Sequence, residues 1–383
     1  MQRSGTRSSC HASVLAEDGM LCLLDIVALS AWPRAALEPF STQLKLLLGD
    51  APPGTDPAPS DLAATLELAG VLGADATASQ LREKAAIWLD RASRLGVEVL
   101  PWGDTRYPAL LAAIPAAPLV LWLQGKVDSL RGQCVAIVGS RVASACGIEA
   151  ATNLAADLLL AGMVIVSGLA RGVDSAAHLG TLGVSGVTVA VLGSGLDSIY
   201  PPEHKRLARE IVERGAVVSE YPPGTPPLPR NFPARNRIIS GLSLGVVVIE
   251  AAEASGSLIT AGCALEQGRH VMAVPGNVLS GRYRGSHALL RDGAAVVEGA
   301  QDVLSELASG SLQSVSRPVP IPFDEGDPLL AAMGPGEARD VDSLSRETGL
   351  QPAALLPRLL DLELRGAVRR VAGGRFLRAG RTC

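Results

Sequence analysis

Residues 134–141 read CVAIVGSR, and residues 163–174 repeat the same design as MVIVSGLARGVD. Each stretch begins with an apolar run, as expected for a strand that is buried on both faces, and then passes through small residues into a helical run. Further strands of this kind are predicted at 187–192, 216–219, 246–249 and 271–274, with helices at 148–161, 173–181, 203–214 and 258–267. This alternation predicts an α/β fold, with an extended Rossmann-like sheet that is parallel and doubly wound.

Five segments differ in composition along the chain. Residues 1–19 are predicted to form a disordered extension, with Met20 as an alternative start, and residues 20–94 a small helical module of SAM or helix-hairpin-helix type. Residues 95–308 hold the predicted sheet, and residues 309–327 form a linker rich in Ser and Pro. Residues 328–383 contain short helical patterns and then strands around a Gly-Gly turn, which predicts a winged helix.

The 383 residues carry a formal charge of −4, whereas nucleic-acid binders usually carry excess positive charge. The charge is distributed unevenly, because residues 221–249 hold three arginines and residues 365–383 hold six, with no acid in either segment. Local basic patches determine phosphate contacts more than the total charge does. The composition therefore does not exclude a nucleic-acid partner.

The six cysteines are scattered without C-x-x-C spacing, so neither a zinc site nor another cofactor is predicted. Scattered cysteines also suggest a reducing compartment, which we expect to be the cytoplasm. No apolar run is long enough to span a bilayer, so no membrane partner is expected.

Four loops rich in small residues lie at predicted strand ends or helix starts, where doubly wound sheets bind ligands. They are Gly139-Ser140-Arg141, the segment 167–172, Gly193-Ser194-Gly195 and Ser255-Gly256-Ser257. Small residues let the backbone approach a ligand, helix starts offer N–H groups, and Arg141 and Arg171 add charges that bind phosphate. Together they predict a groove for phosphates. The dinucleotide motif G-x-G-x-x-G is not met at the first loop and the P-loop motif is missing, which disfavours NAD and ATP.

Residues 229–241 read PRNFPARNRIISG and combine an aromatic ring with arginines and asparagines. The residues that we select from this segment are Phe232, Arg235, Asn236 and Arg237. Arginines beside a ring suit a single nucleic-acid strand, with charge for the backbone and the ring for a base. The alternative is that Phe232 fills the core and that the arginines pair with acids such as Glu220 and Glu250.

Taken in series, these motifs resemble the DprA (Smf) family of bacterial DNA-processing proteins. The resemblance covers residues 95–300 in order, through segments 107–108, 121–125, 139–141, 167–174 with His178, 193–197, 200–201, 219–220, 232–233, 235–243, 255–261 and 268–276. One position departs from the family pattern, because His287 stands in segment 285–290 where an Asn is usual. We therefore assign no binding role to that loop.

The resemblance implies a protein that is not an enzyme, binds single-stranded DNA in a basic pocket and forms homodimers. It also implies that the protein loads the recombinase RecA onto incoming DNA during natural transformation. Arg141 is the expected principal phosphate ligand, and Lys205 is expected to add a basic side chain. The complete set of expected DNA-binding residues is Ser140, Arg141, Ser167, Gly168, Arg171, Lys205, Phe232, Arg235, Asn236, Arg237, Ser255, Gly256 and Ser257.

Two other classes of function remain open. A nucleotide-processing enzyme of the LOG phosphoribohydrolase type also uses small-residue loops, although its P-G-G-x-G-T signature is missing and 275–277 is the nearest approach. Asp174 and His178 have acid–base spacing, but we expect them to fix the geometry of their loop. A transcription factor would bind duplex DNA through the winged helix. The arginines of the wing suit duplex phosphates, and they suit a solvated basic face or a protein-docking surface equally. These arginines are Arg365, Arg369, Arg370, Arg375 and Arg378.

Overall fold

The structure is a computed structural model that describes residues 22–31, 66, 74–314, 328–333, 338–364, 368–371 and 375–378. The chain divides into two compact units, Met1–Ser311 and Leu312–Cys383. The predicted extension over residues 1–19 lies outside the described residues. No described helix is both long enough and apolar enough to cross a membrane.

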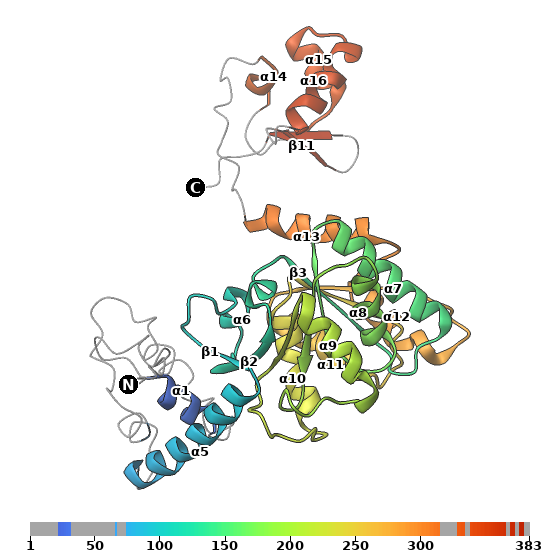
Figure 1. Cartoon of the computed structure of the whole chain (residues 1–383). Helices are drawn as coiled ribbons and strands as arrows, with labels where there is room; N and C mark the ends of the chain where they lie inside the picture. Colours follow the sequence, from blue (N-terminus) through green and yellow to red (C-terminus); the bar gives the residue numbers. More distant parts are fainter. Residues whose placement is uncertain are drawn as a thin grey trace, which may run out of the picture. The chain divides into compact units, whose positions relative to one another are not determined.

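A nine-stranded sheet forms the centre of the first unit (Figure 1). Its strands are β1 (Glu98–Pro101), β2 (Val120–Gly125), β3 (Cys134–Gly139), β4 (Val164–Ser167), β5 (Thr188–Leu192), β6 (Ala216–Ser219), β7 (Gly245–Ile249), β8 (His270–Ala273) and β9 (Ala295–Val296). Their order is β1-β2-β6-β5-β4-β3-β7-β8-β9, in which β6 to β9 are parallel. The six strands predicted from the sequence are β3 to β8, so the α/β, Rossmann-like fold class is confirmed.

Helices cover both faces of this sheet (Figure 1). One face packs against α7 (Ala145–Leu160), α8 (Val173–Gly183) and α13 (Ala300–Ser314). The other packs against α9 (Lys205–Arg214), α10 (Asn231–Gly241) and α11 (Gly256–Glu266). Shorter connecting helices are α6 (Ala109–Ala112), η3 (Val127–Leu130), η4 (Pro202–His204), η5 (Gly281–Tyr283) and α12 (Arg284–Arg291). The four helices predicted between strands correspond to α7, α8, α9 and α11.

The apolar runs of the sequence follow from this layering. Side chains alternate between the two faces of a strand. In β3, Val135 and Ile137 enter the core under α7 and α8, whereas Ala136 and Val138 enter the core under α10 and α11. Because both faces are covered, every residue from Cys134 to Val138 is buried and apolar.

Strands β1 and β2 were not predicted. They pair antiparallel to each other, and β2 pairs antiparallel to β6. They lie outside the strand–helix alternation on which the prediction depended. Their side chains nevertheless join the main core, and Trp122 of β2 is fully buried.

The strand order reverses beside β3. The chain adds β4, β5 and β6 in turn on one side of β3, and then returns to add β7, β8 and β9 on the other side. The loops that follow β3 and β7 therefore diverge and leave a crevice at the carboxyl ends of the strands. This topological switch point is where ligands bind in doubly wound sheets.

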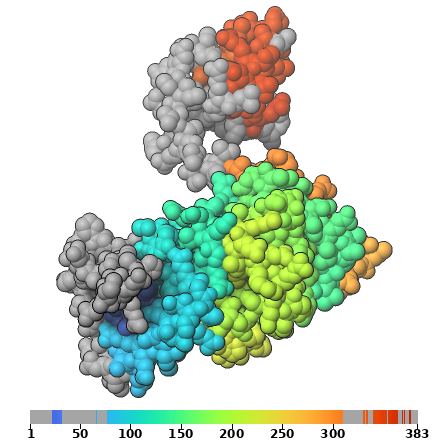
Figure 2. Space-filling view, in the orientation of Figure 1, coloured from blue at the N-terminus to red at the C-terminus, as the bar shows by residue number. Residues whose placement is uncertain are grey.

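Two N-terminal helices pack on the same core. They are α1 (Leu23–Leu29) and α5 (Ala74–Arg94), and Ile26, Leu29 and Leu81 are buried in the cluster that includes β1 and β2. Asp25 of α1 binds Arg82 of α5 at 2.6 Å. Figure 2 shows the surface of α5 running without a break into the rest of the unit. The described part of segment 20–94 is thus helical and shares its core with the sheet.

The second unit is a winged helix, as predicted. Its elements are α14 (Pro328–Ala331), β10 (Ala338–Arg339), α15 (Val341–Thr348), α16 (Pro352–Leu364), β11 (Val368–Val371) and β12 (Arg375–Arg378), with strand order β10-β12-β11. Leu344, Leu359 and Phe376 are buried in its core. The segment predicted as a linker, 309–327, begins as helix, because α13 continues to Ser314. Its remaining residues lie outside the described residues.

The arginines of the wing are only partly described. The guanidinium of Arg370 lies over the Phe376 ring at 5.4 Å from its centroid, and Arg375 is exposed. Arg365 and the side chains of Arg369 and Arg378 lie outside the described residues. The choice between duplex DNA and a protein partner for this surface stays a prediction.

Candidate nucleic-acid interface

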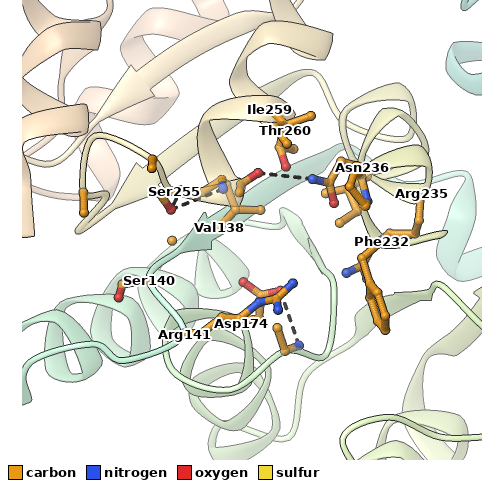
Figure 3. Close-up of a pocket in the computed structure, with 18 of the residues that line it drawn as sticks. Val138, Ser140, Arg141, Asp174, Phe232, Arg235, Asn236, Ser255, Ile259 and Thr260 are labelled. Atoms are coloured by element: carbon orange, nitrogen blue, oxygen red, sulfur yellow. Dashed lines mark hydrogen bonds between the residues drawn. The ribbon is translucent and has the colours of Figure 1, made fainter. Parts of the chain in front are cut away.

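A cavity of about 500 Å³ opens at the switch point, between the loops after β3 and β7 (Figure 3). Figure 3 shows Ser140 and Arg141 on one wall, and Phe232, Arg235 and Asn236 on the facing wall. The lining consists of residues 138–142, Ala170, Asp174, Phe232, Pro233, Arg235, Asn236, Ile239, Ala252, residues 254–257, Ile259 and Thr260. Eight of the thirteen predicted residues therefore meet at one cavity.

The loop after β3 is shaped by a close approach of two strands. A Cβ on Gly139 would lie 1.8 Å from the carbonyl oxygen of Ile249, so only glycine fits there. The Ser140 N–H donates to the Glu250 carbonyl at 2.9 Å, and the Ser140 hydroxyl accepts from the Val142 N–H at 3.1 Å. The turn leaves Arg141 exposed at the mouth of the cavity.

The N-terminus of α7 binds a carboxylate of the chain itself, at the place where the sequence predicted an external phosphate. The Glu250 carboxylate accepts hydrogen bonds from the Ser144 N–H at 2.9 Å and from the Ser144 hydroxyl at 2.5 Å. The Ser144 hydroxyl in turn accepts from the Gly147 N–H at 3.1 Å. An internal carboxylate thus takes the place predicted for phosphate.

The loop between β4 and α8 is closed in the same way. The Asp174 carboxylate accepts from the N–H groups of Gly168 at 3.1 Å and Ala170 at 3.4 Å. Burial raises the pKa of Asp174, and the Arg235 guanidinium and these N–H groups oppose the rise. Asp174 thus fixes the loop geometry, whereas His178, for which this role was also predicted, bonds Thr188 of β5 instead. Arg171 ion-pairs with Glu203 at 2.6 Å.

Helix α11 presents its N-terminus to the cavity. Ser255 caps the helix by accepting from the Ser257 N–H at 3.3 Å, and its hydroxyl lies 2.7 Å from that of Ser257. Gly256 is exposed and lines the cavity with both serines. Within the described part of the chain, no carboxylate accepts a hydrogen bond from this helix start, so it suits an anion better than the start of α7 or α8 does.

An aromatic pair extends the cavity. The rings of Phe232 and Tyr200 lie 5.5 Å apart, and the Arg141 guanidinium lies 5.8 Å from the Phe232 centroid. A small hollow beside them is lined by Arg141, Gly168, Ala170, Arg171, Tyr200, Pro201, Phe232 and Arg235. Four of these residues also line the main cavity. One continuous track therefore leads from α11 past Phe232 to Arg171.

The three polar residues predicted on α10 have different environments. Arg235 is buried, and its guanidinium donates to the carbonyl oxygens of Gly168, at 2.7 Å, and Val191. Burial lowers the pKa of Arg235 to about 10, and Asp174 opposes this shift. Asn236 donates to the Gly256 carbonyl at 3.2 Å on the cavity wall.

Arg237 faces away from the cavity. It ion-pairs with Glu220 and donates to the carbonyl oxygens of Ala116 and Ala234, both at 3.1 Å. Residues two apart lie on different faces of a helix, so Arg235 and Arg237 cannot both reach one groove. The expectation that Arg237 binds the strand is corrected here, and the alternative that it pairs with Glu220 is confirmed.

Two other expected residues do not line the cavity. Ser167 is fully buried, and its hydroxyl donates to the Ile137 carbonyl at 2.6 Å across the sheet. Lys205 is exposed at the start of α9 and lines neither hollow. In the third predicted loop, the Ser194 hydroxyl donates to the Ser198 carbonyl at 2.7 Å. This hydroxyl therefore makes a hydrogen bond within its own loop.

The histidines give no acid–base pair in the cavity. His178 is fully buried, and its Nδ1 lies 2.8 Å from the Thr188 hydroxyl. Burial lowers its pKa to about 3, so it is neutral at physiological pH. His287 Nε2 lies 3.3 Å from the backbone nitrogen and 3.1 Å from the carbonyl oxygen of Gly276, and its tautomer decides which of the two it hydrogen-bonds. The described residues contain no cluster that could hold a metal ion.

Sequence reasoning missed part of the cavity wall. Ile259 and Thr260 line it one turn after Gly256, and Val142 lines it beyond Arg141. Helical spacing from Gly256 would have indicated the first two, because residues three and four apart share a helix face.

The fold and the cavity define a class of protein. It is a Rossmann-like protein with an arginine-bearing cavity at its switch point, followed by a winged helix. The sequence profile of the DNA recombination-mediator protein A family matches residues 98–308, and that of the DprA winged helix domain matches residues 316–374. The chain therefore belongs to the DNA recombination-mediator protein A family, whose members are also called DprA and Smf.

Individual relatives agree with this assignment. Protein Smf of Escherichia coli K12 is 40% identical over 313 residues, which cover 79% of this chain and 82% of that protein. The X-ray structure of DNA processing protein A from Streptococcus pneumoniae matches with a TM-score of 0.65 and 35% identity, over 75% of this chain and 99% of that chain. A structure of DNA processing protein A from Helicobacter pylori, described by its single-stranded DNA binding mode, matches with a TM-score of 0.51 and 28% identity, over 56% of this chain and 96% of that chain.

Proposed function

We propose that this protein binds single-stranded DNA at the switch-point cavity, without preference for base sequence. The observation that carries the proposal is the position of Arg141, exposed at the mouth of the cavity and 5.8 Å from the Phe232 ring. Among the described residues, it makes no ion pair. A cation and a ring side by side suit a phosphate and its neighbouring base.

The rest of the cavity supplies the second phosphate contact. The α11 N-terminus, with Ser255, Gly256 and Ser257, offers N–H and hydroxyl donors to a phosphodiester. Asn236 lies on the same wall, and its amide oxygen, which makes no hydrogen bond within the described residues, can accept one from the polar edge of a base. Gly168 and Arg171 extend the track from the small hollow. These contacts are to the phosphate backbone and the ring faces of the bases. Every nucleotide has both, so the contacts give no preference for base sequence.

The related protein from Helicobacter pylori supports this proposal, because its structure is described by a single-stranded DNA binding mode. We extend the proposal to the family role: the chain, as a homodimer in the cytoplasm, protects incoming single strands and loads RecA onto them during transformation and recombination. The family membership supports this extension.

The alternative of a nucleotide-processing enzyme has less support. A hydrolase needs a nucleophile or water held by a base with a matched pKa. In this cavity, Asp174 is held by backbone N–H groups, and the neutral His178 is buried away from the lining. The binding function is therefore favoured.

The test is the affinity of Arg141→Ala for fluorescent single-stranded and duplex DNA of equal length, measured by anisotropy at two salt concentrations. We expect the variant to lose about 1.5–3 kcal/mol of single-strand affinity, the range for a charged hydrogen bond. The slope of log affinity against log salt should fall by about 0.7, the value for one single-strand phosphate.

Arg131→Ala is the matched control, because Arg131 is also exposed but precedes β3 at the opposite edge of the sheet. It should leave the affinity and the salt slope unchanged. Equal affinity of the wild type for single strands and duplex, or no effect of Arg141→Ala at either salt concentration, would remove the cavity from the proposed function.

A further inference from the structure

The loop after β8 is fastened to the wall of the cavity. Arg282, in η5, donates to the Val142 carbonyl at 2.7 Å and to the Glu250 carboxylate at 3.3 Å. Val142 itself lines the cavity. One guanidinium thus joins the loops after β3, β7 and β8, and this contact places the third loop beside the cavity wall at Val142.

This rim exposes aliphatic side chains. Val142 is 75% exposed, Val278 is 78% exposed and Leu279 is 91% exposed. Single exposed aliphatic residues are common, but here three lie on two loops that Arg282 joins. The tip of the β8 loop is held by its own bonds, because Leu279 N–H donates to the Asn277 side chain at 2.8 Å. The aliphatic side chains are therefore presented by an ordered turn.

The same loop is positively charged. Residues 275–284 read PGNVLSGRYR, with two arginines and no acid. Glu250 offsets the charge of Arg282. Arg284 is exposed at the start of α12 and makes no ion pair among the described residues. Aliphatic surface beside a cation matches a polynucleotide, whose sugars and bases are partly apolar and whose phosphates are anionic.

The volume of the cavity also requires a path outside it. A space of about 500 Å³ is the size that holds one drug-sized ligand, so most of a long strand must lie on the surface. The β8 loop combines apolar exposure with Arg284, which makes no ion pair among the described residues, whereas Arg171 beside the small hollow pairs with Glu203.

We propose that the single strand leaves the cavity over Val142 and continues along Val278, Leu279 and Arg284. This proposal rests on the proposed function, because it takes the cavity as the primary DNA site. It assigns a binding role to a loop to which the sequence analysis gave none. The occupant is the same polynucleotide strand, and a second copy of the chain or a protein partner is an alternative that the test below separates.

The test compares oligothymidylates of about 4 and about 16 nucleotides, the range of site sizes known for single-strand binders. The full-length chain is measured by anisotropy as wild type, as Val278→Ser with Leu279→Ser, and as Arg284→Ala. We expect each variant to lose at least about fivefold affinity for the long strand, the scale of one stacked base. Affinity for the short strand should stay within about twofold, because the cavity is intact.

Leu160→Ser and Arg131→Ala are the matched controls. Leu160 is 74% exposed at the end of α7, and both residues lie at the edge of the sheet opposite the cavity. Neither should change the affinity for either length. Sedimentation velocity of the variants without DNA reports self-association separately.

The outcomes distinguish this proposal from the proposed function. If the wild type binds neither length, the cavity function itself fails. If the wild type binds both lengths and the rim variants bind the long strand as tightly as the wild type does, only the path along the β8 loop is overturned. A change in sedimentation without any change in long-strand affinity would also overturn it, because it would assign the rim to a second copy.

Discussion

Replacing Arg237 by alanine should destabilise the fold and leave DNA binding by the folded protein intact. The side chain of Arg237 is 7% exposed and that of Glu220 is 22% exposed, so this ion pair is largely shielded from water. Arg237 also donates to Ala116 and Ala234. Ala116 has a left-handed backbone, with φ 52°, that this bond helps to hold.

The magnitude follows from these contacts. Removing one partner of a buried ion pair costs about 3–5 kcal/mol, because the other charge is left without compensation. Glu220 can still reach water, so we expect the lower end, about 3 kcal/mol. For domains of 150–250 residues, each kcal/mol shifts Tm by about 2–4 °C. The larger first unit should therefore lose roughly 6 °C.

Thermal unfolding and DNA anisotropy on the same samples make the assay. Arg141→Ala provides the reverse pattern, because Arg141 is exposed: it should lose DNA affinity and keep its Tm within about 1 °C, the usual range for a surface change. The reasoning is refuted if Arg237→Ala keeps the wild-type Tm and loses DNA affinity. That result would make Arg237 a ligand of the strand.

Two further predictions concern buried groups near the cavity. Burial lowers the pKa of His178 from 6.5 to about 3. As the pH falls, this histidine is therefore protonated in the unfolded chain before it is protonated in the folded one. The free energy of unfolding decreases between pH 6.5 and pH 3, and the loss is about 2 kcal/mol at pH 5. His178→Asn should flatten the pH dependence of Tm over this range, and an unchanged slope would contradict the assignment. Glu250→Ala should lower the free energy of unfolding by about 2–4 kcal/mol, because the Ser144 N–H and hydroxyl lose the carboxylate that accepts from them and Arg282 loses its ion-pair partner. Denaturant titration should show a smaller loss for Glu250→Gln, which keeps an acceptor, and equal losses would contradict the capping role.

The sequence predicted the parallel part of the sheet because its signal is local. An apolar run such as 134–138 is buried on both faces by helices of the same strand–helix alternation. The sequence pattern therefore predicts both the strands and the helical layers that cover them. The antiparallel strands β1 and β2 lack this signal. Their place depends on pairing with β6, which lies some 90 residues farther along the chain.

The site was predicted less completely than the fold, because the partner of an arginine decides whether its guanidinium is bound internally or stays exposed. In the sequence, each of Arg141, Arg235 and Arg237 follows a small or polar residue. In the structure, Arg235 binds carbonyl oxygens of β5 and the β4 loop, Arg237 binds Glu220, and Arg141 stays exposed. The partners are separated by 17 to 67 residues, so no local pattern could show them.

For the proposed single strand, the same dependence would restrict the registers in which it could bind. An open helix N-terminus attracts phosphate wherever it lies, so three open termini at one sheet edge would offer the strand several competing registers. Glu250 closes α7, and Asp174 closes the loop before α8. Of these three termini, the start of α11 is the one from which no carboxylate among the described residues accepts a hydrogen bond, and it lines the same cavity as Arg141. If the cavity binds a single strand as proposed, these two buried carboxylates direct it by removing two of the positions at which it could otherwise bind.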